Sequence, residues 1–522
     1  MNYNYKCQAN RIATWVLRGP LTAILFGIAL LHLECWLLSC LAWPWSPDHD
    51  VFATLARSWD AGVLPYRDME ANNPPVTIYL YWALGKAFGW GRTTPFFAFD
   101  AVLTASLGIV MMVWSRRRFE TMLPAAVGYL WFLRYYLGLD YSMAGQRDWH
   151  ASLLATAAIM AAESCFGRRG RWISAAAAAG AVAIRPQCLL FLPVLILIVG
   201  SERRRLEPPT AMGAFRTLLE WAGVFALVLA LAFAPLVAAG VLGDFAHDFR
   251  RAAYGGRRNP LTVWIFFERI LTVLWRWEFL AILGASIVST FQTRSPFRWG
   301  GAAWISALLA TVLYKAISPR QHNYLDIPLF LLLAVNLSIV VGMVLRSRET
   351  PAALRLAAVS LALGVNAHAS LYTGQHHVNM QWSFASVEEI WYGREPIVYP
   401  NGYSGDYPLR DYEALLKHLR TKTDPQVSLA NALAYPLALT GPTARLSAFP
   451  AESLAWLMEA RPDDEDVFVD KLERTQNSVV IWIPSEFRRS RIAQFKRIEQ
   501  AIRRLYEPDA RVGPFEIWRR TM

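Results

Sequence analysis

Length, composition and charge argue against a soluble enzyme and against a nucleic-acid-binding protein. The chain has 522 residues, 55% of them hydrophobic, with 22 tryptophans and a positive mean hydropathy, values typical of a protein whose main solvent is the bilayer. The formal net charge is +12, but the basic residues form short clusters between apolar runs, so they indicate membrane topology and no nucleic-acid partner.

Apolar runs of near-spanning length follow one another along the first 371 residues. A membrane-spanning helix needs about 20 residues. The runs occupy residues 21–43, 95–114, 120–137, 149–166, 173–200, 215–242, 270–291, 299–317, 324–345 and 352–371. The first run ends without the small-residue cleavage site of a signal peptide, so we expect it to be a retained span.

Clusters of Lys and Arg set the expected orientation. They precede the first run and recur at Arg116–Arg118, Arg168–Arg171, Arg203–Arg205, Arg294/Arg298 and Arg346/Arg348, and the positive-inside rule assigns all of them to the cytoplasm. Only one crossing then fits before Arg116, so the stretch 74–90 is predicted to stay outside as an interfacial helix. The run 173–200 must turn back at Arg185–Pro186. About eleven spans result.

These boundaries predict three parts. Residues 1–20 form a cytoplasmic segment, residues 21–371 a multi-span all-α domain with a first outer loop at 44–94, and residues 372–522 a small α/β domain outside the membrane. In that last part, amphipathic stretches at 410–421 and 487–505 predict helices, and runs at 477–483 and 511–518 predict strands. The localisation expected is a bacterial inner membrane, with the last part in the periplasm.

The first outer loop carries a dense set of polar residues. Asp48, His49 and Asp50 open a predicted helix, where a carboxylate can cap the helix and complement its dipole. Capping explains one of the two aspartates but not the rest of the loop, which continues through Gly62, Tyr66–Arg67–Asp68 and a run of turn formers. A rigid loop of this kind at a membrane surface can carry a site.

A second set of polar residues lies just before the fourth apolar run. It contains Gln146, Arg147, Asp148 and His150. Arg147 and Asp148 alone would fit a surface ion pair of little energetic value. An acid, a base and a histidine together at a span boundary favour a functional role.

The third set consists of basic residues on the predicted outer side. Arg185, Lys315, Arg320 and His322 belong to it, and the arginines between 250 and 258 extend it. Either the topology is wrong or something anionic compensates these charges. A bound phosphate would do so, because arginine offers a planar donor fork to phosphate oxygens. For the arginines at 250–258, anionic lipid headgroups are an equal alternative.

These motifs resemble the GT-C superfamily of membrane glycosyltransferases, which includes protein O-mannosyltransferases and lipid A aminoarabinose transferases. The matching residues are Pro47–Asp48, Ala56, Gly62, Pro65–Tyr66–Arg67–Asp68 and Pro74–Pro75 for the first motif, Gln146–Arg147–Asp148 for the second, and the Arg185–Pro186 turn. The resemblance covers about residues 20–200. The triplet Asp48–His49–Asp50 departs from the usual acidic pair, and the alignment favours Asp48 over Asp50 as the base.

The resemblance implies a polyprenyl-phosphate-linked sugar donor and an acceptor hydroxyl on a glycan, lipid or protein. Asp48 is then the expected general base, and Asp148 a second catalytic residue. The remaining predicted site residues would bind substrate: Asp50, Tyr66, Arg67, Asp68, Gln146, Arg147, His150, Arg185, Lys315, Arg320 and His322. No cofactor is required by the sequence, although Mg²⁺ or Mn²⁺ could bind through Asp148.

Two other functions remain open from the sequence. A transporter or lipid flippase would also have many spans and intramembrane charges, but such proteins often show broken helices in paired halves. This chain has one such break, at Arg185–Pro186. An assembly protein whose outer domain binds a partner would have no need for Asp, Arg and His in separate outer loops. The donor sugar and the acceptor cannot be read from the sequence.

Overall fold

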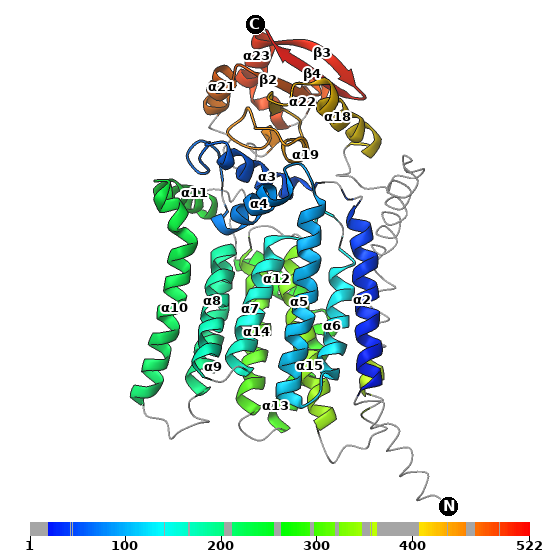
Figure 1. Cartoon of the computed structure of the whole chain (residues 1–522), viewed down its shortest axis with the longest axis vertical. Helices are drawn as coiled ribbons and strands as arrows, with labels where there is room; N and C mark the ends of the chain where they lie inside the picture. Colours follow the sequence, from blue (N-terminus) through cyan, green and yellow to red (C-terminus); the bar gives the residue numbers. More distant parts are fainter. Residues whose placement is uncertain are drawn as a thin grey trace, which may run out of the picture. The chain divides into compact units, whose positions relative to one another are not determined.

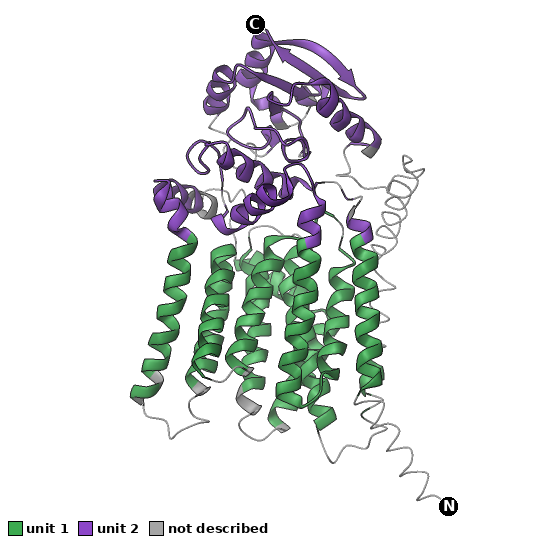
Figure 2. Cartoon of the chain, in the orientation of Figure 1, with its two compact units in different colours: residues 1–37, 99–232, 259–379 green, residues 38–98, 233–258, 380–522 purple. Residues whose placement is uncertain are grey.

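The protein divides into two compact units, each assembled from segments that are distant in sequence. The computed structural model describes residues 19–41, 43, 45–71, 73–139, 141–164, 167–202, 211–254, 263–292, 297–318, 323–346, 355, 358–362, 407–435, 437–455, 465–489 and 491–521. Unit 1 comprises residues 1–37, 99–232 and 259–379, and unit 2 comprises residues 38–98, 233–258 and 380–522 (Figure 2).

Unit 1 is a bundle of helices that run alongside one another (Figure 1). Its helices are α2 (Pro20–Leu41), α5 (Thr94–Phe119), α6 (Leu123–Tyr136), α7 (Arg147–Ser164), α8 (Arg168–Ile184), η1 (Pro186–Phe191), α9 (Leu192–Glu202), α10 (Ala211–Ala238), α12 (Val263–Leu274), α13 (Trp277–Gln292), α14 (Phe297–Ile317), η3 (Asn323–Asp326) and α15 (Ile327–Arg346). Helices α7 and α8 pack closely. Both helices bury small residues, including Ala155 on α7 and Ala175 and Ala179 on α8, and small residues allow close helix approach in a bilayer.

Several of these helices can cross a membrane. Five are long and apolar enough: Pro20–Cys40, Thr94–Phe119, Phe215–Ala238, Gly300–Ile317 and Tyr324–Arg346. A sixth span arises if α12 and α13, bent by 74° at their junction, count as one. The chain is therefore a multi-pass membrane protein. The described residues do not confirm about eleven spans, because several other helices are too short or too polar, and most of the run 352–371 lies outside those residues.

The predicted break at Arg185–Pro186 is present. Helix α8 ends at Ile184, Arg185 has an extended backbone (φ −141°, ψ 103°), and Pro186 begins the 3₁₀ helix η1. Proline cannot donate a helical hydrogen bond, and it disfavours a helical conformation at the preceding residue. The α-helix therefore ends at this point, and the break lies at Arg185.

Unit 2 combines short helices with a four-stranded sheet. Its elements are α3 (Pro47–Asp60), α4 (Pro75–Phe88), α11 (Leu242–Tyr254), α18 (Leu409–Lys422), β1 (Ser428–Asn431), α19 (Thr440–Thr443), α21 (Glu465–Arg474), β2 (Ser478–Trp482), α22 (Pro484–Arg489), η4 (Arg491–Gln494), α23 (Lys496–Leu505), β3 (Tyr506–Val512) and β4 (Phe515–Arg520). The strand order is β1-β2-β4-β3, with β1 and β2 parallel and the other pairs antiparallel. Its core includes Val480, Trp482, Ile498 and Phe468.

The predicted fold class, a polytopic helical part and a small α/β part, is confirmed. Helix α18 and strand β2 match their predictions, and α4 is the expected short helix in the first loop. Two details were wrong. The helix expected at 487–505 is interrupted by η4, and the strand expected at 511–518 is a hairpin that turns at Gly513 (φ +53°). The domain boundary at 372 falls outside the described residues, and the side on which each part lies stays a prediction.

Candidate functional site

Helix α3 presents the first group of candidate residues, in unit 2. Ser46 caps the helix, because its hydroxyl accepts a hydrogen bond from the backbone N–H of His49 at 3.1 Å. Pro47 fills the first helical position, where proline loses nothing. Asp48 and Asp50 follow in the first turn, with Asp48 half-buried and Asp50 fully buried. Neither aspartate is therefore the cap that the sequence allowed.

Asp50 joins α3 to a segment nearly four hundred residues later. Its Oδ2 accepts from the backbone N–H of Leu439 at 2.8 Å, and its Oδ1 accepts from the backbone N–H of Gly441. The hydroxyl of Thr440 lies 3.3 Å from both carboxylate oxygens. A Cβ on Gly441 would overlap the Asp50 carboxylate, so only glycine fits there. The predicted substrate-binding aspartate thus makes a structural link within unit 2.

A second buried carboxyl group, Glu452, completes this link. Burial raises the pKa of Asp50 to about 6, although the two backbone N–H groups act to lower it. Burial and the nearby charges of Asp50 and Asp48 hold the pKa of Glu452 well above its usual range. Burial therefore favours the protonated form of Glu452. Both Glu452 carboxyl oxygens are buried and have no hydrogen-bond partner in the part of the chain that the structure describes.

The loop after α3 holds Tyr66, Arg67 and Asp68 in a tight turn. Tyr66 has a left-handed backbone (φ +70°), its hydroxyl donates to the carbonyl of Asn73 at 2.7 Å, and Asp68 accepts from the backbone N–H of Leu64 at 2.9 Å. Arg67 forms an ion pair with Asp244 of α11 at 2.9 Å. All three predicted site residues thus have structural contacts, and their substrate-binding role stays a prediction.

In unit 1, the predicted residues Asp148 and Arg185 form a direct ion pair. Arg185 Nε lies 2.8 Å from Asp148 Oδ1, and the Asp148 side chain is fully buried. Tyr314, on α14, donates a hydrogen bond to the same carboxylate oxygen. The second oxygen, Oδ2, is buried and has no hydrogen-bond partner among the described residues. Asp148 therefore keeps one acceptor oxygen for another donor.

Lys315, the residue after Tyr314, belongs to an adjacent charge cluster. Its ammonium group is paired with Asp326, and Arg276 lies 3.2 Å from the other oxygen of Asp326. Arg269 donates to the carbonyls of Ala316, in the last turn of α14, and Ser318, just past its end. The sequence prediction missed Tyr314, Asp326 and Arg276. An acidic residue inside the predicted apolar run 324–345 was the available signal for Asp326.

His150 contacts a buried aspartate that the sequence prediction also missed. His150 Nε2 lies 3.2 Å from Asp100 Oδ1, and Tyr136 donates to Asp100 Oδ2 at 2.6 Å. Gln146 donates to the carbonyl of Ser142 at 2.8 Å, and Arg147 is half-buried at the start of α7. An aspartate inside the apolar helix α5 is itself a sign of a functional or structural network.

The remaining predictions concern residues or ions that the structure does not test. Arg320 and His322 lie outside the described residues. Within the described ranges, no three His, Cys, Asp or Glu side chains are grouped so that they could hold a metal ion. A divalent cation at Asp148 therefore stays a prediction.

The predicted site residues that the structure describes divide between the two units. Unit 2 contains Asp48, Asp50, Tyr66, Arg67 and Asp68, and unit 1 contains Gln146, Arg147, Asp148, His150, Arg185 and Lys315.

Comparisons with known proteins identify the fold. No protein-family model matches the sequence, and no curated protein matches it. Among solved structures, ArnT from Cupriavidus metallidurans bound to undecaprenyl phosphate is 12% identical, with a TM-score of 0.60 over 96% of this chain and 98% of that one. The apo state of the same ArnT is 14% identical, with a TM-score of 0.56 over 96% and 97%. The expected resemblance is confirmed as a likeness of fold to ArnT over nearly the whole chain.

Proposed function

We propose that the chain is a bacterial inner-membrane glycosyltransferase. It would move a sugar from a polyprenyl-phosphate-linked donor to an acceptor hydroxyl on the outer side of the membrane. The observation that carries this proposal is the likeness of fold, over 96% of the chain, to an ArnT structure that contains undecaprenyl phosphate. The sequence motif supports the proposal independently. Its three parts lie in the first outer loop, at Asp148 and at Arg185.

In this reaction the acceptor oxygen attacks the anomeric carbon, and the bond from that carbon to the phosphate oxygen breaks. A carboxylate takes the hydroxyl proton, and polyprenyl phosphate leaves with the bonding electrons. Asp48 is the proposed base, a role that typically contributes ~10²–10⁴-fold to the rate. The contacts of Asp50 favour Asp48, because both oxygens of Asp50 already accept backbone hydrogen bonds.

The cluster in unit 1 is the proposed site for the leaving phosphate. Arg185, Lys315 and Arg276 outnumber Asp148 and Asp326, so these side chains carry excess positive charge in a largely buried environment. Such excess favours a bound anion, since uncompensated buried charge is unfavourable. Fixed positive charge also stabilises the negative charge that develops on a leaving phosphate. Arg320 and His322 follow Lys315 closely in sequence and are proposed to add to it.

The test is direct release of the lipid product. The purified protein, in lipid nanodiscs, receives undecaprenyl-phosphate-linked sugars and a membrane extract as the source of acceptor, and mass spectrometry measures undecaprenyl phosphate. A glycosyltransferase releases it, whereas a flippase leaves the donor intact. Asp48→Asn should lower release by ~10²–10⁴-fold while membrane insertion is retained. Full activity of Asp48→Asn would remove Asp48 from the role of base.

A further inference from the structure

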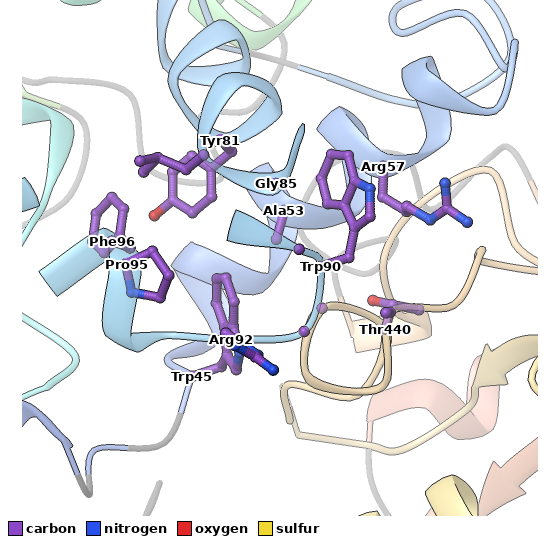
Figure 3. A pocket seen from close by; sticks show the side chains of 15 residues that line it. Trp45, Ala53, Arg57, Tyr81, Gly85, Trp90, Arg92, Pro95, Phe96 and Thr440 are labelled. Carbon is purple, nitrogen blue, oxygen red and sulfur yellow. The ribbon is translucent and has the colours of Figure 1, made fainter. Parts of the chain in front are cut away.

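The pocket of unit 2 shown in Figure 3 is filled by its own side chains. The ring of Trp90 lies across Gly85, where any Cβ would overlap it, and the guanidinium of Arg57 lies 5.6 Å from the centroid of the same ring. The room that remains is about 20 Å³, enough for about one water molecule. The pocket therefore has no space for a larger ligand. A larger unfilled surface lies in unit 1, on helix α10.

Helix α10 lies at the edge of the bundle and packs against α8 near its beginning (Figure 1). Gly213, Thr217 and Trp221 occur at every fourth position, so they lie on one face of α10, and all three are buried. The indole of Trp221 donates a hydrogen bond to the hydroxyl of Ser174 on α8 at 3.3 Å. This face of α10 therefore points toward α8.

The same face is left incompletely covered further along α10. The residues that continue it in unit 1 are apolar and only half-buried, and we call them the α10 stripe: Val224, Phe225, Val228 and Ala232. Residues 222–232 include no fully buried side chain. Beyond Ser174, α8 continues with alanines at 175–179 and with Gly180, whose short side chains cannot reach across to α10. The α10 stripe is thus an apolar surface that lipid must cover.

The α10 stripe has the length of one lipid chain. From Trp221 to Ala232 the helix rises by about 16 Å, at 1.5 Å per residue. One leaflet contributes half of a hydrocarbon core that is about 30 Å thick. The stripe therefore matches a single acyl chain in the leaflet nearer the beginning of α10. The positive-inside prediction makes this the cytoplasmic leaflet.

Arginines gather at the beginning of the α10 stripe. Glu220 accepts hydrogen bonds from Arg168 and, at 3.1 Å, from Arg171. Arg216 lies one helical turn before Glu220, and Arg216 and Arg169 are both exposed. Arg171 Nε is buried and has no hydrogen-bond partner among the described residues. At this end of α8 and α10 the described residues thus supply four arginines and one carboxylate, so the local charge is positive.

We propose that this end of α8 and α10 binds an anionic phospholipid of the bilayer. Its phosphate would accept charge-assisted hydrogen bonds from Arg169 and Arg216, and one acyl chain would lie along the α10 stripe. Basic clusters beside membrane helices favour anionic headgroups in this way. Arg168 and Arg185 lie at opposite ends of α8, about 25 Å apart along the helix. The lipid site is therefore separate from the proposed site of the leaving phosphate and does not depend on the transfer reaction.

Direct measurement of lipid binding tests the proposal. Native mass spectrometry follows the titration of delipidated protein, in detergent micelles, with dioleoyl phosphatidylglycerol or dioleoyl phosphatidylcholine. The two lipids have the same chains, so a difference reports the headgroup. Phosphatidylglycerol should bind at least about tenfold more tightly, as expected for added charge-assisted hydrogen bonds. Equal affinities would overturn the role of the arginines. Tighter binding of undecaprenyl phosphate at the same site would assign the α10 stripe to the donor lipid and would also overturn the proposal.

One double variant tests the headgroup site. Arg169→Gln combined with Arg216→Gln changes two exposed residues, so folding should be retained, and it should reduce the affinity for phosphatidylglycerol to that for phosphatidylcholine. The matched control combines Arg116→Gln with Arg117→Gln, at two exposed arginines near the end of α5, and should change nothing. An equal loss in both double variants would show that net charge, and no particular site, attracts the lipid.

A second pair of variants tests the α10 stripe. Val228→Trp places a large ring where the acyl chain would lie and should weaken the binding of phosphatidylglycerol at least about tenfold. Leu227→Trp is the matched control, because Leu227 lies on another face of α10 and is 59% exposed. Its affinity should equal that of the wild type. Unaltered binding both in Val228→Trp and in the double variant at Arg169 and Arg216 would overturn the assignment.

Discussion

Units 1 and 2 both bury carboxylates, but they stabilise them by different means. In unit 1, Asp148 is paired with Arg185, and Asp326 is paired with Lys315 and Arg276. In unit 2, Asp50 has the backbone N–H groups of Leu439 and Gly441 instead of a cation, and the buried Glu452 lies close to it. The first arrangement depends on opposite charges that must both be present, and the second depends on backbone hydrogen bonds and on burial that raises the pKa of both carboxyl groups. The two units should therefore respond differently to mutation and to pH.

The largest expected effect is the loss of the Arg185 charge in unit 1. Arg185→Ala leaves the Asp148 carboxylate buried without its cation, which should cost about 3–5 kcal/mol in the free energy of unfolding. Denaturant unfolding of the purified protein in detergent micelles measures that loss. The matched control is Arg168→Ala, because Arg168 forms an ion pair with Glu220 but its side chain is 69% exposed. Its loss should be below about 1 kcal/mol.

A double variant sharpens this result. Asp148→Asn combined with Arg185→Ala removes both charges, so it should be less destabilised than Arg185→Ala alone. If the double variant were less stable than Arg185→Ala alone, the unpaired charge of Asp148 would not be the cause of the lost stability. In the transfer reaction, Arg185→Ala should chiefly weaken use of the lipid donor, and unchanged donor kinetics would identify a purely structural arginine.

The second effect is a pH dependence confined to the carboxyl pair of unit 2. Burial raises the pKa of Asp50 from its ordinary value of 3.8 to about 6, so the folded state binds this proton more tightly than the unfolded state does. Stability is then fully present below about pH 4 and falls as the pH rises to about 6, by about 3 kcal/mol. Glu452, whose pKa is also raised, extends the fall to higher pH.

Glu452→Gln tests this dependence. The amide has a similar size but cannot ionise, so the fall in stability with rising pH should become shallower. Thermal unfolding between pH 4 and 7 measures the slope for the wild-type protein and the variant. The control Glu268→Gln changes an exposed acid in unit 1 and should leave the slope as in the wild type. Parallel slopes for Glu452→Gln and the wild type would show that Glu452 does not contribute to the pH dependence.

The smallest effect concerns the fit of Gly441 against Asp50. Gly441→Ala places a methyl group on the carboxylate and close to Ala53, which should destabilise the protein by about 1–3 kcal/mol. Gly27→Ala is the matched control, because a Cβ there meets nothing within 4 Å. That change should be neutral or stabilising, since alanine favours a helix over glycine. Thermal unfolding of both variants measures the difference, and equal melting temperatures would contradict a tight fit at Gly441.

Much of the fold could be predicted because the decisive signals are local. Apolar length predicted the long helices, and Pro186 predicted the break after α8. The hairpin of β3 and β4 was missed because Tyr506–Val512 is polar and contains a proline, so its pairing depends on the partner strand rather than on its own composition. The count of about eleven spans stays a prediction, because several of the predicted runs form helices that are short or polar, and most of the run 352–371 lies outside the described residues.

The site could be predicted only in part, because only some of its residues are indicated by local sequence signals. Asp148 and Arg185 were expected at one site and form an ion pair. The partners Asp100, Asp326 and Glu452 were missed, because each is a single acid whose role is created by residues distant in sequence. The Asp50 link shows the limit most clearly: a carboxylate at a helix start is typical of a capping residue, and only tertiary structure supplies Leu439 and Gly441.

The hydrogen bonds of Asp50 to Leu439 and Gly441 can form only late in biosynthesis. Leu439 follows Asp50 by 389 positions, and translation at 5–20 residues per second separates their synthesis by about 20–80 s. During that interval the nascent chain exposes a carboxylate that later becomes fully buried. The loop that carries Asp48 is thus completed only near the end of translation, so chains truncated before residue 439 should be recognised by quality-control proteases through that unfinished loop.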